Sequence, residues 1–140
     1  MTPAMLNLQF EQVSLYPAGH ATRDIRVQPT VLLPAGWSAA TALDGAAVEG
    51  NRIRYGVTTY ETLVDSPIFA GAHLRRWPLG HGVTLNVVAD EPRFLEATPE
   101  QIGAHIALVD EAVLLFGTRH FDHYEFLLAL TEELGGIGLE

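Results

Sequence analysis

Two histidines and an aspartate lie close together in the run His120-Phe-Asp-His123. Imidazole nitrogens and carboxylate oxygens are ligands that zinc accepts, and zinc needs three or four of them. Three candidate ligands within four loop residues are a weak pattern, however, and a polar loop between two elements explains the same residues more simply. We therefore treat His120, Asp122 and His123 as weak metal-ligand candidates and expect no metal cofactor in this chain.

No other combination of residues makes a complete active site. Ser66 has no Gly-x-Ser-x-Gly around it, which argues against a serine nucleophile. The chain contains no Lys and no H-E-x-x-H, so neither a Walker-type phosphate loop nor that zinc motif is present. His105 lies beside the apolar positions of an expected helix, and we expect it to be a half-buried packing residue.

The composition excludes several classes of protein. The 140 residues are 48% hydrophobic and 18% charged, which is typical of one folded domain rather than a disordered chain. Eight basic residues, all Arg, oppose 17 acidic ones, giving a formal charge of −9. An acidic chain without a basic cluster argues against nucleic acid or an anionic membrane as a partner. The absence of Cys removes disulfides and thiol catalysis.

The clearest structural element is a helix that begins after Thr98. Thr98 can cap the free backbone N–H groups, Pro99 suits the first helical position, and Gln101 completes a capping box. Gly117 is a natural stop for the helix. Apolar residues recur at steps of four and three along it and predict a buried stripe: Ile102, Ile106, Val109, Val113 and Phe116.

The part of the chain before residue 92 has the pattern of short strands and turns, because Pro and Gly interrupt its apolar runs every few residues. Pro29 cannot donate to a ladder, so its strand should lie at an edge or be bulged. The run 124–134 is ambiguous, because its Leu, Ala and Glu residues favour a helix but also suit a buried strand. We expect strands at residues 12–16, 26–33, 52–58, 73–78 and 84–89.

Several strings, in order, resemble the glycyl aminopeptidase family of zinc metallopeptidases, which are thermolysin-like enzymes that usually carry a PDZ domain. The resemblance covers nearly the whole chain from Leu6 onward. The strings are SLYPAG (14–19), LPAGW (33–37), YETLVDSPIFAG (60–71), LNVVADEP (85–92), ATPEQI (97–102), LFGTRHFDHYEFLLAL (115–130) and GGIGLE (135–140).

The resemblance implies that this chain is part of a peptidase that removes small N-terminal residues from peptides. The family's zinc-binding H-E-x-x-H and its distal Glu ligand would follow beyond residue 140, so the 140 residues alone should be inactive. The run 136–140 looks like the family's edge strand beside the zinc site. Glu140, with Gly138 beside it, would then bind the α-amine of the peptide substrate. The resemblance also favours a strand, not a helix, for residues 124–130.

We therefore expect an α+β fold with a β-rich, sandwich-like N-terminal portion, one long amphipathic helix and a short β region. Residues 1–96 would belong to the N-terminal β domain and residues 97–140 to the start of the catalytic domain. The unpaired C-terminal region should make the chain self-associate. A free-standing β-rich module that binds a partner protein is the alternative function.

Overall fold

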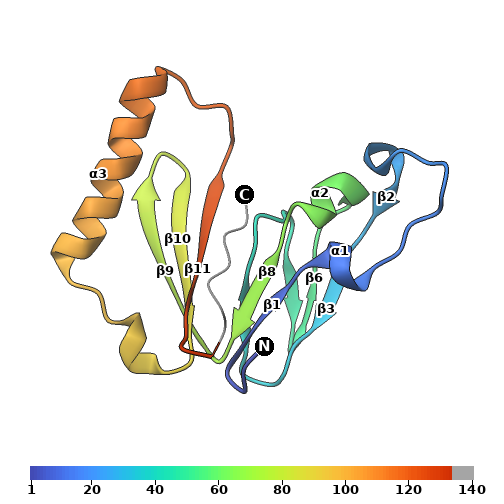
Figure 1. Ribbon diagram of the computed structural model, residues 1–140, viewed down its shortest axis with the longest axis horizontal. Coiled ribbons are helices and arrows are strands. Elements are labelled where there is room, and N and C mark those ends of the chain that lie inside the picture. The colour runs from blue at the N-terminus through green and yellow to red at the C-terminus, as the bar shows by residue number, and fades with distance from the viewer. Residues whose placement is uncertain (134–140) are drawn as a thin grey trace.

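The computed structural model describes residues 1–133 and shows a mixed α+β fold, as the sequence predicts. Figure 1 shows small sheets built from the first half of the chain beside a three-stranded sheet that carries the long helix α3. The elements in chain order are β1 (Met5–Leu8), α1 (Phe10–Val13), η1 (Thr22–Asp24), β2 (Arg26–Val27), β3 (Thr30–Leu32), β4 (Ser38–Ala40), β5 (Ala47–Glu49), β6 (Arg52–Arg54), β7 (Thr58–Thr59), α2 (Tyr60–Val64), β8 (Ile68–Gly71), β9 (His73–Gly80), β10 (Val83–Ala89), η2 (Pro92–Leu95), α3 (Pro99–Phe116) and β11 (Tyr124–Leu130).

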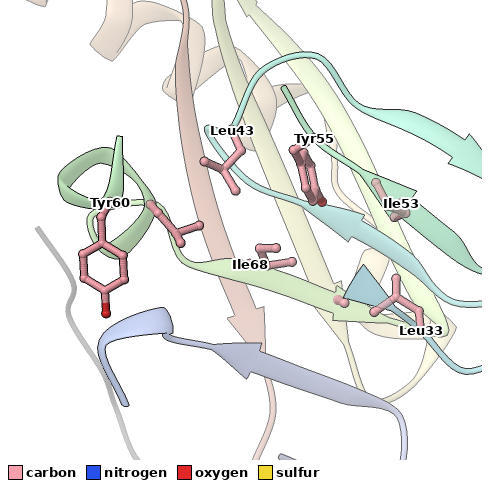
Figure 2. Close-up of a cluster of buried hydrophobic side chains, with 8 residues drawn as sticks. Leu33, Leu43, Ile53, Tyr55, Tyr60 and Ile68 are labelled. Carbon is pink, nitrogen blue, oxygen red and sulfur yellow. The ribbon is translucent and has the colours of Figure 1, made fainter. Parts of the chain in front are cut away.

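The β-rich N-terminal portion consists of three small antiparallel sheets with the strand orders β1-β8-β4, β3-β6-β5 and β2-β7. Strand β8 pairs with β1 and β4 on its two sides, and Met5 lies opposite Gly71. A shared apolar core lies between these sheets and α2 (Figure 2). Its buried members are Leu33, Leu43, Ile53, Tyr55, Tyr60, Leu63, Ile68 and Ala70.

Strand β10 is the centre of the second sheet, whose order is β11-β10-β9. It pairs antiparallel with β9 and parallel with β11, in a register that runs from Val83 opposite Tyr124 to Ala89 opposite Leu130. The chain between the two parallel strands forms η2 and α3, the helical crossover that parallel pairing requires. Helix α3 covers the face of this sheet that is turned away from the small sheets (Figure 1).

The N-terminus is fastened to the end of β10. The Thr2 side chain, 5% exposed, accepts from the backbone N–H of Met5 and donates to the carboxylate of Asp90. Hydrogen bonds from the side chains of Thr131 and Thr2 lower the pKa of Asp90 below its usual range. One carboxylate therefore joins the N-terminus, the end of β10 and the residue that follows β11.

Both ends of α3 confirm the prediction from the sequence. The Thr98 side chain accepts from the backbone N–H of Gln101, and the Gln101 side chain accepts from the N–H of Thr98, which completes the capping box. Gly117 ends the helix with φ +66°, a left-handed conformation that favours glycine.

The predicted apolar stripe is only partly buried. Val109 is 6% exposed and packs on the sheet, whereas Ile106 and Phe116 are 36% and 70% exposed. The assignment of these two residues to the core is therefore wrong. Three strands separated by under 5 Å from one another offer a narrow surface, and the one helix resting on it buries Val109 and half-buries Ile102 and Val113.

The strand predictions are right for the sheet that carries α3 and only partly right for the N-terminal sheets. Strands β9 and β10 confirm those at 73–78 and 84–89, and β11 confirms the strand chosen for residues 124–130. The prediction at 26–33 becomes β2 and β3, because the chain changes partner around Pro29. Of the prediction at 52–58, only β6 and the start of β7 are strand.

The strand predicted at residues 12–16 is wrong, because α1 and an irregular segment occupy this stretch. The Ser14 hydroxyl donates to the backbone C=O of Phe10, and Tyr60 lies within hydrogen-bond distance of the same hydroxyl. These hydrogen bonds hold residues 10–14 in a helical turn next to Tyr60 of α2, so this segment is not an extended strand. Strands β1, β4, β5 and β8 were not predicted.

We expect Val109→Ala to lower the free energy of unfolding by roughly 1.5–3 kcal/mol, because it removes two methyl groups from the contact between α3 and the sheet. Leu114→Ala is the matched control on the same helix, since Leu114 is 75% exposed and its truncation should change stability by under about 0.5 kcal/mol. Urea unfolding followed by circular dichroism measures both. Equal effects of the two substitutions would show that α3 does not pack through Val109.

Candidate functional site

The loop 117–123 is held against the tight turn between β9 and β10. Gly82, in this turn, has no side chain, and a Cβ on it would lie 2.8 Å from the backbone oxygen of Asp122. The Arg119 guanidinium donates to the backbone oxygen of His81, and the N–H of Tyr124 donates to the oxygen of Gly82. These contacts fix where β11 begins and set its register on β10.

This register places His123 between two carboxylates. Its Nε2 lies 3.1 Å from Oδ1 of Asp44 and its Nδ1 lies 3.5 Å from Oε1 of Glu125. Asp44 belongs to the loop between β4 and β5, so the contact joins the N-terminal sheets to the start of β11. The Asp44 side chain is 86% exposed, and water therefore weakens its attraction to the imidazole.

The Glu125 side chain accepts a hydrogen bond from the buried side-chain amide of Asn86. Asn86 on β10 is 3% exposed, and its Nδ2 donates to Oε2 of Glu125 at 2.6 Å and to the backbone oxygen of Phe126 at 3.3 Å. A buried amide that lost these acceptors would cost about 1–3 kcal/mol. Asp44, Asn86, His123 and Glu125 thus form one polar network, which we name the junction cluster.

Asp44 is positioned by a close approach of two backbone segments. The N–H of Gly56 donates to the backbone oxygen of Asp44 at 2.8 Å, and a Cβ on Gly56 would lie 3.3 Å from that oxygen. Gly45 has φ +69° and also contacts Gly56. Two glycines are therefore needed where the loop that carries Asp44 crosses the segment between β6 and β7.

Two hollows lie beside the junction cluster. An open cleft of about 590 Å³ runs between β11 and the elements α1, α2 and β8, and it holds the carboxylates of Glu11, Asp65 and Glu125. A smaller cavity of about 290 Å³ lies between Glu125 and the N-terminal core. Tyr55 lines this cavity, and burial raises the pKa of its phenol, an effect that the nearby Arg76 charge opposes.

The weak metal-ligand candidates do not converge. His120 is exposed, Asp122 presents its backbone oxygen to Gly82, and both ring nitrogens of His123 are turned toward the carboxylates of the junction cluster. Within residues 1–133, no three His, Cys, Asp or Glu side chains lie close enough to hold a metal ion. The described residues therefore do not fit zinc.

Two other candidates from the sequence have structural explanations. The buried Ser66 hydroxyl donates to the backbone oxygen of Thr62, so Ser66 caps the end of α2. His105 was expected to be half-buried, but it is exposed, with Nδ1 2.7 Å from the backbone oxygen of Gln101. That expectation is wrong because α3 turns His105 toward water. Gly138 and Glu140 lie outside the described residues.

The sequence reasoning named His123 but missed its partners. Asp44, Asn86 and Glu125 come from a loop, a central strand and an edge strand, and 79 residues separate Asp44 from His123. A polar Asn in an otherwise apolar strand was the one available signal, because a buried amide requires a partner. None of the helices within residues 1–133 has the length and the apolar composition that crossing a membrane requires.

We expect Asn86→Asp to lower the free energy of unfolding by roughly 2–3 kcal/mol at pH 7, because it sets a second buried carboxylate against Glu125. Two adjacent carboxylates bind a shared proton more tightly in the folded chain than in the unfolded one. The deficit should therefore shrink as the pH falls toward 4. Urea unfolding at several pH values measures it, and a deficit independent of pH would contradict the arrangement.

The double variant Asn86→Asp/Glu125→Gln is the control for this experiment. It restores an amide opposite a carboxylate, with the two groups exchanged between β10 and β11. We expect it to regain at least half of the lost stability at pH 7 and to lose the pH dependence of the deficit.

Comparisons with known proteins agree with this architecture. The peptidase M61 N-terminal domain matches residues 1–72. No curated protein matches the chain. A crystal structure of an aminopeptidase N family protein from Idiomarina loihiensis has a similar fold, with a TM-score of 0.71 and 18% sequence identity. The similarity covers 95% of this chain but only 23% of that one, and at this identity it concerns the fold alone.

The residues matched by the family domain are the ones that build the three small sheets and their common core, from β1 through β8. They also include Asp44, the N-terminal member of the junction cluster. This match spans half of the chain, and the chain therefore belongs to the peptidase M61 (glycyl aminopeptidase) family, with residues 1–72 corresponding to its N-terminal domain.

Proposed function

We propose that this chain is the N-terminal part of a zinc-dependent aminopeptidase that removes small N-terminal residues from peptides. The observation that carries the proposal is the family match over residues 1–72, continued by a fold similarity that includes β9, β10, α3 and β11. In this proposal the 140 residues have no catalytic activity of their own. They provide the N-terminal domain and the sheet on which the catalytic site is assembled.

Zinc would be bound by polypeptide that follows residue 140. The arrangement of the described residues is compatible with this division. His123 contacts two carboxylates, and no three potential ligands lie close together within residues 1–133. Zinc would supply an activated water to a peptidase of this class. The contribution of this chain is structural: β10 and the junction cluster hold β11 in a fixed register next to the segment that follows it.

The proposal assigns substrate recognition to the run 136–140. Glu140 would accept hydrogen bonds from the α-ammonium group of the peptide, and Gly138 would allow the substrate backbone to approach closely. A carboxylate dedicated to a free amine would explain selectivity for unblocked N-termini. The run follows β11 by a few residues in the sequence.

The division of the chain at residue 96 is also part of the proposal. Residues 1–96 would belong to the N-terminal domain and residues 97–140 to the beginning of the catalytic domain. Strands β9 and β10 precede this division, yet they form one sheet with β11. In this proposal the two domains therefore share a sheet and form a rigid joint.

We expect the polypeptide encoded by the complete reading frame to bind about one zinc per chain and to hydrolyse glycyl and alanyl anilides. It should not hydrolyse their N-acetylated forms. Metal analysis after dialysis and a colorimetric rate assay measure these properties, with the 140-residue chain as a control that shows neither zinc nor hydrolysis. A complete polypeptide without zinc or hydrolysis, or a 140-residue chain that retains either, would contradict the proposal.

In the complete polypeptide, Glu140→Gln should lower kcat/KM for glycyl anilide about 10- to 100-fold, because a charge-assisted hydrogen bond to the substrate amine is lost. Glu133→Gln is the matched control, since Glu133 is exposed and is not assigned to substrate. Steady-state kinetics compare the variants. Unchanged kcat/KM in Glu140→Gln would remove Glu140 from the recognition of the amine.

A further inference from the structure

Helix α3 leaves one strand of its sheet uncovered. The helix packs against β9 and over β10, and Val109 is its most buried residue. On β11, Tyr124, Phe126 and Leu128 point to the same side of the sheet as α3, because alternate residues of a strand share a face. They are 36–47% exposed, although they lie opposite the buried residues of β10.

A groove of about 310 Å³ separates α3 from these side chains. Its lining is almost entirely apolar and includes Leu108, Ala112 and Phe116 from the helix and Tyr124 and Phe126 from the strand. Leu115 lies on the same side of α3 as Leu108, seven residues or two turns away, and is 78% exposed. We name this surface the α3–β11 face: Leu108, Leu115, Phe116, Tyr124, Phe126 and Leu128.

A surface of this kind is rarely left bare in a soluble protein, because burial of each large apolar side chain is worth roughly 1.5–3 kcal/mol. The geometry also indicates what fits. A helix resting beside α3, at the usual spacing of about 8–10 Å, would lie over β11 and continue the layer that α3 begins. The occupant therefore needs an apolar side and an elongated shape.

The part of the chain that carries this face is acidic overall. Residues 90–133 carry two Arg against ten Asp or Glu, whereas residues 1–89 carry six Arg against six Asp or Glu. Asp110 and Glu111 lie on α3 itself, and this helix has no Lys or Arg. The groove itself is lined by one charged residue, Arg119, so its lining favours an apolar occupant and does not set the charge of that occupant.

We propose that the α3–β11 face is the docking surface for the polypeptide that follows residue 140 in the complete chain, which would place on it a segment with an apolar side. The inference rests on the proposed function only in requiring a longer chain. The length of the related structure supports it, because this chain corresponds to only 23% of that structure and most of that polypeptide lies outside the matched region. The docked segment would hold α3 and β11 together on the side away from the junction cluster.

The absence of Cys allows a direct test, because a single introduced thiol is the only reactive one in the 140-residue chain. Leu115→Cys places the thiol on the α3–β11 face. Leu114→Cys is the matched control, since Leu114 is 75% exposed but its side chain is turned by about 100° around the helix. Both substitutions are made in the 140-residue chain and in the complete polypeptide, and the maleimide reaction rate at each site is followed by peptide mass spectrometry.

We expect the complete polypeptide to react at least about tenfold more slowly at position 115 than the 140-residue chain does, and less than about threefold more slowly at position 114. Equal rates at position 115 in the two proteins would overturn the inference, and so would a reading frame that ends at residue 140. Protection of position 115 in the complete polypeptide that disappears on dilution would also overturn it, because a second copy would then occupy the face.

Hydrolysis of glycyl anilide by the same preparations separates this inference from the proposed function. A complete polypeptide that protects position 115 but has no peptidase activity would contradict the proposed function and leave the docking surface standing. An active peptidase with a freely reactive thiol at position 115 would contradict the docking surface alone.

Discussion

The burial of β10 on both faces is the constraint on which the rest of the structure depends. Toward α3 it presents Val83, Leu85 and Val87, and toward the N-terminal sheets it presents Asn86 and Val88, all of them buried. Both of its edges are also paired, with β9 and β11. A strand enclosed in this way cannot shift by one residue without exchanging its two faces, so it fixes the relation between the two parts of the molecule.

The junction cluster shows what this constraint means for a site. Asn86 is the one polar residue of β10 that is buried, and it faces the Glu125 side chain across the parallel pair. A shift of β11 would separate these two groups and would also remove His123 from Asp44. The hydrogen bonds of the junction cluster therefore add specificity to the β10–β11 register, which apolar packing stabilises. In our proposal the segment that follows β11 in the sequence recognises the substrate.

The sequence was most informative where structure is local. The capping box at Thr98 and the stop at Gly117 depend on residues within one turn, and both were predicted. Strands β1 and β8 pair across 60 to 66 residues, and no local pattern indicated this pairing. Residues 124–130 have the propensity of a helix, but the partner offered by β10 makes them a strand, as the family resemblance implied. The junction cluster could not be predicted for the same reason, since its members meet only through β10.

The central claim is that these 140 residues are the N-terminal part of a zinc aminopeptidase. The measurement that tests it most directly is the nucleotide sequence that follows codon 140. Our account predicts, within roughly the next 100 codons, an H-E-x-x-H on a helix with an apolar side, followed by a further Glu that completes the zinc ligands. A stop codon, or a continuation without this motif, would contradict the account and favour a free-standing module that binds a partner protein.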